Sequence, residues 1–299
     1  MTEPAIAFRG DLATPRSLRA RALGLAAPAL AWITVFLIAP LCLVLAVAFC
    51  GRGDYGQIEW RFTSANLARA LGCAADGFSD VNLRIAARTL WLSAGTTAIC
   101  LVLGFALSLV IATRRPALRA LLLAAVMIPF GTNLVIRTYG WQLLLAGRGP
   151  LAPIAAALGL SEPGLALYPS PIAVWVGMVA ALAPFAVAPL YAVVERLDWS
   201  LVEAARDLNA GRWRVLRHAL LPQVAPGLTA AAVLTFIPAL GMFVVSDLLG
   251  GAKHMLIGNL VQQQLARDWP YGAALGVWLI VATLAALVLA RRGPDRARA

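Results

Sequence analysis

Long apolar runs alternate with polar segments along most of the chain. A membrane-spanning helix needs about 20 mostly apolar residues. Six runs reach that length: 23–49, 86–112, 118–145, 172–194, 224–249 and 272–290. Only 13% of the residues are charged and 61% are hydrophobic, which differs widely from the balance of a soluble domain. We therefore predict an all-α, polytopic membrane protein with six transmembrane helices.

The predicted organisation is one six-span domain, residues 23–290, between a basic N-terminus, 1–22, and a basic tail, 291–299. Basic residues precede the first apolar run, as they do in a signal peptide. The run extends over about 27 residues, well beyond the apolar region of a signal peptide, so we interpret it as a retained span. We expect residues 154–160 to form a short helix at the membrane interface and the tail to be disordered.

The positive charge is distributed unevenly between the two sides of the predicted membrane. The net charge is +11, and 16 of the 25 Lys and Arg residues lie in the two termini, the segment 113–119 and the segment 195–222. Only seven lie in the three loops on the opposite side. The positive-inside rule places the richer side in the cytoplasm. We predict that both termini are cytoplasmic and that the charge faces anionic lipid rather than nucleic acid.

The segment from Ser200 to Pro222 is the one long polar stretch between two membrane-length runs that contains both acids and arginines in quantity. Ser200 and Glu203 have the spacing of a capping box, which predicts a helix from Leu201. Gly211 is suited to the left-handed residue that ends such a helix. We expect a second short helix to follow and Pro222 to mark the return to the membrane.

Residues of this segment resemble a family pattern. Glu203-Ala204-Ala205, Gly211 and Leu221-Pro222 are similar to the E-A-A, G and L-P signature of permease subunits of ABC importers. The resemblance implies a type I importer architecture in the bacterial inner membrane. It also implies that these six residues couple the chain to a cytoplasmic ABC ATPase dimer, which binds the ATP, so that this chain needs no cofactor of its own.

Three longer blocks narrow the resemblance. Residues 128–141, 201–211 and 238–274 resemble the PotB-type family of spermidine/putrescine permeases. This implies a polyamine substrate, a second permease subunit that completes the pathway, and a periplasmic or lipid-anchored substrate-binding protein. Permeases for opines, amino-acid-like solutes or iron share much of this architecture and stay open as alternatives. An ATP-independent secondary carrier also stays open, with the polar segment as a simple amphipathic connector.

Several residues near the predicted outer side are candidates for the substrate pathway. Asp247, beside Ser246, would stabilise an ammonium group, or would instead cap the outer loop or pair with Arg137 or Lys253. Tyr139 and Trp141 offer aromatic faces to a cation, although aromatic residues also gather at membrane interfaces without binding anything. Arg137 lies within the third run, where an ionisable residue is costly. We expect it to form a structural ion pair or to extend to the surface.

Glu203 has two interpretations that are compatible with each other: it completes the cap of its own helix, and it pairs with an arginine of the ATPase. No nucleotide-binding loop, zinc motif or Ser/His/Asp constellation occurs in the sequence, and we expect no enzyme activity.

Among the four cysteines, Cys42 and Cys100 suit apolar surroundings, and Cys50 and Cys73 both fall on the outer side. Whether those two form a disulfide depends on geometry that the sequence does not provide.

Overall fold

The computed structural model describes residues 25–53, 56–74, 77–160, 162 and 164–296. The first span, Leu25–Ala48, contains a π-helical turn, η1 (Thr34–Ile38), followed by α2 (Ala39–Ala48). The remaining helices are α3 (Ala65–Ala70), α4 (Val81–Ala112), α5 (Pro116–Met127), α6 (Leu134–Leu144), α7 (Ala152–Ala157), α8 (Pro171–Val194), α9 (Trp199–Asp207), α10 (Arg212–Val215), α11 (Leu221–Gly241), α12 (Val244–Gly250), α13 (Ile257–Leu265) and α14 (Trp269–Arg296). Short helical turns are η2 (Ile128–Gly131), η3 (Leu216–Leu220) and η4 (Ala252–His254).

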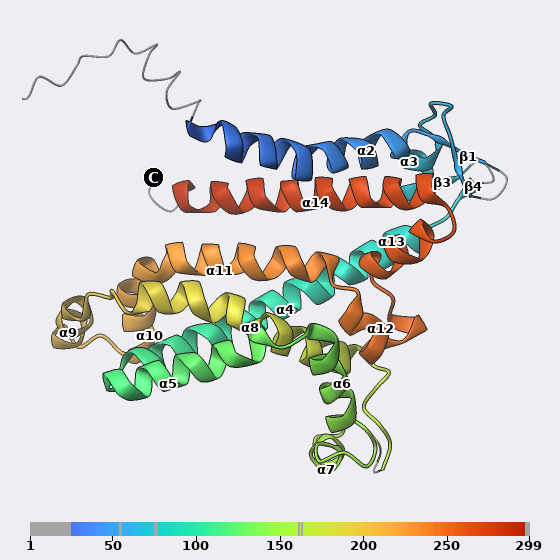
Figure 1. Cartoon of the computed structure of the whole chain (residues 1–299). Coiled ribbons are helices and arrows are strands. Elements are labelled where there is room, and N and C mark those ends of the chain that lie inside the picture. Colours follow the sequence, from blue (N-terminus) through green and yellow to red (C-terminus); the bar gives the residue numbers. More distant parts are fainter. Residues whose placement is uncertain (1–24, 54–55, 75–76, 161, 163, 297–299) are drawn as a thin grey trace, which may run out of the picture.

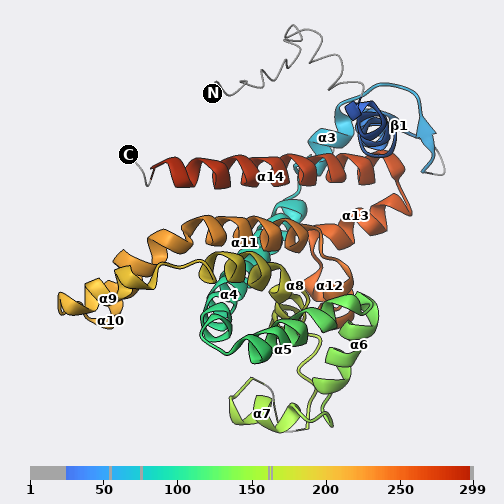
Figure 2. The same cartoon turned by 60° about the vertical axis from the view of Figure 1, so that its left-hand side comes forward.

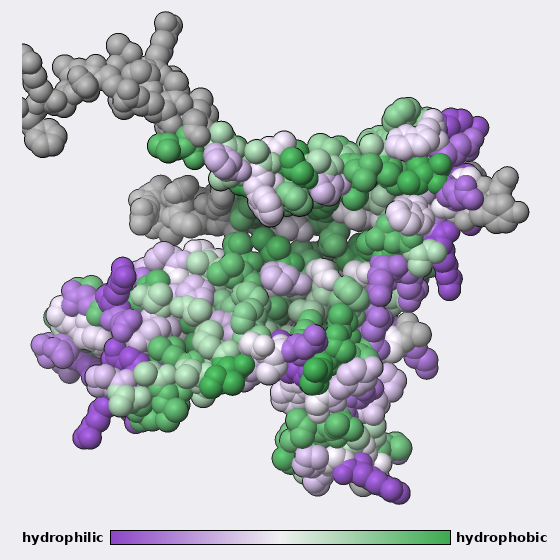
Figure 3. Space-filling model, viewed as in Figure 1, coloured by the Kyte–Doolittle hydropathy of each residue, from purple (hydrophilic) through white to green (hydrophobic). Residues whose placement is uncertain are grey.

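The structure confirms the membrane-spanning architecture. Five helices are long and apolar enough to cross a bilayer, and a bent pair of helices brings the number to six if it counts as one span. α4, α8 and α11 pack together as a central bundle, and α14 lies beside the first span on one flank of it (Figures 1 and 2). Polar side chains gather at both ends of the bundle, and apolar ones cover its sides (Figure 3). We call these the loop end, which carries α9 and α10, and the hairpin end, which carries the strands, α12 and α13.

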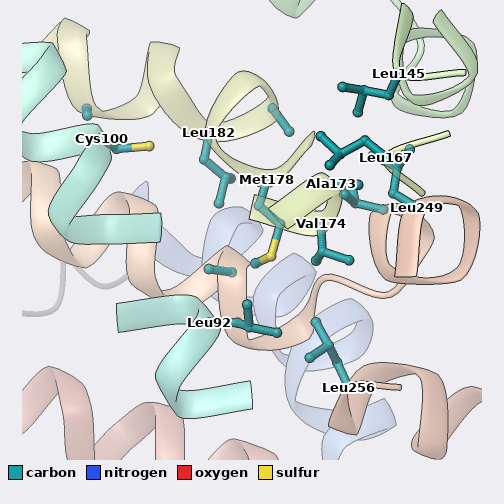
Figure 4. Close-up of a cluster of buried hydrophobic side chains, with 14 of the residues drawn as sticks. Leu92, Cys100, Leu145, Leu167, Ala173, Val174, Met178, Leu182, Leu249 and Leu256 are labelled. Carbon is teal, nitrogen blue, oxygen red and sulfur yellow. The ribbon is translucent and has the colours of Figure 1, made fainter. Parts of the chain in front are cut away.

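The core lies between α4, α8 and α12. Met178 and Leu182 of α8 contact a cluster that includes Leu92 of α4, Leu249 of α12 and Leu256 before α13 (Figure 4). All five side chains are buried. Gly177 permits the close approach of α12 to α8, because a Cβ atom at position 177 would lie 2.5 Å from Cδ1 of Leu249. Close packing therefore fixes α12, although it is too short to span the membrane, against the first turns of α8 at the hairpin end.

The third and fifth spans are each broken, which corrects two predictions. The third apolar run forms α5 and α6, which meet at 102° after the turn η2. Pro129 removes a backbone donor there, and the side chain of Asn133 caps α6 by accepting a hydrogen bond from the amide of Val135, at 2.8 Å. The fifth run ends as a helix at Gly241, and α12 begins separately at Val244. The outer halves, α6 and α12, pack against each other.

The hairpin end is held by the first polar loop, which contains more regular structure than we predicted. Two hairpins of two-residue strands, β1 (Gly51–Arg52) with β2 (Ile58–Glu59) and β3 (Cys73–Ala74) with β4 (Gly77–Phe78), flank α3. Asp268, which is 2% exposed, accepts a hydrogen bond from Arg69 at 3.1 Å, and its carboxylate lies 3.7 Å from the guanidinium of Arg52. This ion cluster ties the loop to the start of α14.

Two further expectations concern the cysteines and the ends of the chain. Cys50 and Cys73 are both free, Cys50 buried and Cys73 exposed, so the structure contains no disulfide between them. α14 continues to Arg296, which corrects the prediction of a disordered tail for its first six residues. The basic N-terminus 1–22 lies outside the described residues. A short helix is present near the predicted range 154–160, but α7 covers Ala152–Ala157, so it begins two residues earlier and ends three residues earlier than predicted.

Candidate functional site

The segment 198–223 at the loop end forms a compact helical unit. α9 begins one turn from α8, and Asp198 is its N-cap: the carboxylate accepts hydrogen bonds from the Ser200 hydroxyl at 2.6 Å and the Ser200 amide at 3.0 Å. These two bonds, the hydroxyl bond first, lower the pKa of Asp198. The predicted capping box of Ser200 and Glu203 is therefore wrong. The helix begins at Trp199, so Asp198 occupies the cap position and its carboxylate accepts a hydrogen bond from the free amide of Ser200. Ser200 itself lies inside the first turn.

The bend that follows α9 also differs from the prediction. Asn209 adopts the left-handed conformation, with φ of 55°, whereas Gly211 has φ of −61° and ψ of 158° and precedes α10. Asparagine tolerates the left-handed region better than most residues with a side chain. The turn is closed by a hydrogen bond from the amide of Ala210 to the carbonyl of Ala205, at 3.0 Å. The chain therefore bends at Asn209, two residues before Gly211.

A small core holds the two halves of the unit together and leaves one face open. Val202, Val215 and Ala219 are buried against one another, with Ala205 packed at the edge. The apolar side of α9 faces outward: Leu201 is 49% exposed and Leu208 is 84% exposed. The side chains that line the hollow on this open face are Leu201, Ala204, Ala205, Leu208, Ala210, Arg214, His218 and Ala219.

The signature residues lie on or near this face. Glu203 and Ala204 are exposed, and within the described residues Glu203 has no side-chain hydrogen bond or ion pair. Gly211 and Pro222 are also exposed, whereas Leu221 packs against the bundle. Trp213 is 69% exposed. The unit therefore presents uncovered apolar side chains on the face with the hollow, and an unpaired carboxylate, that of Glu203, elsewhere on its surface.

The unit continues into the fifth span without interruption, which corrects the expected break at Pro222. The helix runs from Arg212 to Gly241 as one 30-residue element. Pro222 has no amide hydrogen to donate to the carbonyl four residues earlier. The preceding turn, η3, widens into a π-helix in which the amide of Leu221 bonds the carbonyl of Leu216. The widened turn accommodates the proline ring within a continuous helix.

Polar contacts hold the two ends of the unit together and brace the chain just before it. The amide of Asp198 donates to the side-chain carbonyl of Gln223 at 3.0 Å, and the Gln223 amide donates to the Ala219 carbonyl at 2.8 Å. Arg119 of α5 donates to Glu195, just after α8, at 2.9 Å. The first contact joins the start of the unit to the beginning of α11, and the second joins α5 to the end of α8.

The hairpin end holds the second group of candidates, around the break of the fifth span. Asp247 on α12 is exposed, and its carboxylate accepts a hydrogen bond from the side-chain amide of Asn259 on α13. Within the described residues it forms no ion pair, so neither Arg137 nor Lys253 neutralises it. Ser246 is buried, and its hydroxyl donates to the carbonyl of His254 at 2.9 Å. Of this pair, Asp247 alone presents its polar group to the surface.

Arg137, Tyr139 and Trp141 lie on α6, at the other broken span. The guanidinium of Arg137 donates to the carbonyl of Pro129 at 2.8 Å, which closes the bend between α5 and α6. The expected ion pair is not formed among the described residues, and a backbone carbonyl at the bend takes the place of the carboxylate. Tyr139 is half exposed, and Trp141 packs against the core.

The structure reveals residues that sequence reasoning missed. Asn259 and Gln223 each join segments that are separated in sequence, and an isolated polar residue in an apolar stretch was the only available signal. The cap by Asp198 could have been predicted from the sequence, because aspartate is itself a common N-cap residue. Among the described residues, no group of three His, Cys, Asp or Glu side chains is placed to hold a metal ion.

Both regions fall inside a recognised family. Residues 104–293 match the family described as binding-protein-dependent transport system inner membrane component. The chain belongs to this family, and it is thus an inner-membrane permease subunit of an ABC importer. The match includes the segment 198–223 and both broken spans.

Individual relatives agree. The spermidine/putrescine transport system permease protein PotB of Salmonella typhimurium (strain SL1344) is 36% identical over 252 residues, which are 84% of this chain and 85% of that protein. The inner membrane ABC transporter permease protein YdcU of Escherichia coli (strain K12) is 30% identical over 283 residues, 87% of this chain and 85% of that protein. A permease chain in the crystal structure of a bacterial alginate ABC transporter, in complex with an alginate pentasaccharide-bound periplasmic protein, has the same fold. Its TM-score is 0.67 at 18% identity, with 94% of this chain and 95% of that chain covered.

Proposed function

We propose that this permease passes polyamines, spermidine or putrescine, across the inner membrane. The observation that carries the proposal is the 36% identity to PotB over 84% of the chain. The exposed, unneutralised Asp247 at the hairpin end supports it, because a carboxylate stabilises an ammonium group. Tyr139, half exposed on α6, supplies an aromatic face for the same cation.

The remaining parts of the proposal concern partners and orientation. The segment 198–223 docks, in the cytoplasm, onto one subunit of an ATPase dimer that binds the ATP. A second permease completes the pathway, and a periplasmic or lipid-anchored binding protein delivers the substrate at the hairpin end. The exposed Glu203 and the open apolar face of α9 support docking, since neither has a partner within the described part of the chain. In this arrangement both termini are cytoplasmic.

Substrate uptake by the assembled importer tests the proposal. The chain is produced with its ATPase, second permease and binding protein, reconstituted into vesicles, and supplied with labelled spermidine or putrescine. We expect ATP-dependent uptake that needs the binding protein. Uptake of another solute in place of polyamines would contradict the substrate, and uptake by this chain without the ATPase would contradict the importer mechanism.

Glu203→Gln tests the docking role separately. Glutamine keeps the size and the helix propensity of the side chain but loses its charge. The expected result is a loss of roughly tenfold in transport-coupled ATP hydrolysis, the effect of removing one charge-assisted contact. Asp207→Asn, an exposed acid on the last turn of the same helix, is the matched control and should leave coupling unchanged. Equal coupling in both variants would show that Glu203 does not contact the ATPase.

A further inference from the structure

The break of the fifth span is closed by a buried side chain from α13. Asn259 is 1% exposed. Its amide donates to the carbonyl of Phe243, at 3.0 Å, and to the carboxylate of Asp247, and its carbonyl accepts from the amide of Leu256 at 2.9 Å. Both amide protons are therefore used, and the side chain has one orientation.

The surrounding backbone keeps Asn259 in place. The neighbouring Gly258 lies so close to the break that a Cβ atom there would be 2.8 Å from the carbonyl oxygen of Gly241. On the other side, the hydroxyl of Thr89 in α4 accepts a hydrogen bond from the amide of Ile257 at 2.9 Å. The first turn of α13 is thus fixed against both α11 and α4, and Asn259 with it.

The chemistry of the contact favours a charged role for Asp247. A lysine or arginine at position 259 would also orient the carboxylate, but it would cancel its charge. A neutral amide holds one carboxylate oxygen and leaves the net negative charge and the second oxygen available. The carbonyl end of the 30-residue helix that stops at Gly241 adds negative potential at the same place.

We propose that Asn259 is a positioning residue that holds the Asp247 carboxylate, still charged, in place to bind one ammonium group of the polyamine. The inference rests on the proposed polyamine import and names how one site residue is oriented. It predicts that Asn259 acts on transport only through Asp247. Residues that merely stabilise α13 act independently of that carboxylate.

A double-mutant cycle in reconstituted vesicles, with labelled spermidine, tests the proposal. Asn259→Ala should reduce kcat/KM for uptake about tenfold, the effect of losing one hydrogen bond to a charged group. Asp247→Asn should reduce it at least as much, and the double variant should be no worse than Asp247→Asn alone. Thr89→Val loosens the same helix without touching Asp247, and its effect should multiply with that of Asp247→Asn.

A second variant does not depend on the stability of α13. Asp247→Glu keeps the charge on an exposed side chain but moves it by one methylene, away from Asn259. It should lose uptake to about the same extent as Asn259→Ala. Wild-type uptake with Asp247→Glu, no effect of Asp247→Asn, or multiplying losses for Asn259→Ala and Asp247→Asn would each overturn the inference while leaving the importer intact. Absence of polyamine uptake by the wild-type complex would instead refute the proposed substrate, and the inference with it.

Discussion

Asp268 offers a quantitative test of how the hairpin end is held together. One carboxylate oxygen accepts from the amide of Tyr271 at 3.2 Å, as a helix cap, and the other accepts from Arg69 at 3.1 Å. The cap contributes about 1 kcal/mol. The ion pair contributes about 1 kcal/mol more, because the Arg69 side chain is 44% exposed and water screens its charge. Asp268→Ala should therefore weaken the attachment of α3 by about 1 kcal/mol, the contribution of the ion pair, and the start of α14 by about 1 kcal/mol, the contribution of the cap.

Cysteine labelling measures that loss directly. α3 also carries Asn66, whose amide donates to the carbonyl of the fully buried Cys50 at 2.7 Å. Release of α3 uncovers Cys50, and a loss of about 1 kcal/mol in the attachment of α3 should speed the labelling of Cys50 by a charged maleimide about fivefold. The background carries Cys73→Ala, because Cys73 is exposed. Asp80→Ala, which removes an exposed pair with Arg84, is the control. Equal labelling rates in the two variants would refute this account of the ion cluster.

Two further substitutions test the loop end and the pH response. Gln223→Leu removes the side-chain acceptor of the Asp198 amide, and it should lower the ratio of solute transported to ATP hydrolysed several-fold. Gln263→Leu, at an exposed site on α13, is the control and should leave that ratio unchanged. Burial first, then the charges of Arg88 and Lys253, hold the pKa of His254 below its ordinary value of 6.5. Unfolded His254 therefore takes up a proton before folded His254 does, and stability falls as pH drops below 6.5 towards the lower folded pKa. His254→Gln should show a smaller fall in Tm between about pH 7 and pH 5, and an identical fall in both proteins would contradict this assignment.

The spans could be predicted from the sequence because the membrane imposes length and apolarity on each one. The breaks at 128–133 and 242–243 could not, since Pro129 and Asn133 mark a disturbance but do not say whether a helix bends through it or stops. The 102° angle results from packing of α6 against α12, which are distant in sequence. A hydropathy profile does not detect such contacts, because it averages only over residues that are neighbours in the sequence.

The position of the segment 198–223 was also predictable, whereas its internal geometry was not. Asp198 and Ser200 are both good caps, and Asn209 and Gly211 both tolerate a left-handed turn. The choice within each pair depends on contacts with Gln223 and with the core of Val202 and Val215. These contacts exist only once the helix returns to the bundle.

The continuous helix from Arg212 to Gly241 connects the two candidate regions. At 1.5 Å per residue, its 30 residues measure about 45 Å, so in the proposed importer it would act as a lever, with the proposed ATPase-docking unit at one end and Asp247 just beyond the other. A tilt of about 5° at the loop end would displace the far end by about 4 Å. A displacement of that size exceeds the length of a hydrogen bond, and it would separate an ammonium group from Asp247 if that carboxylate binds it as proposed. Under that proposal, release of the substrate would require no rearrangement within the binding region itself.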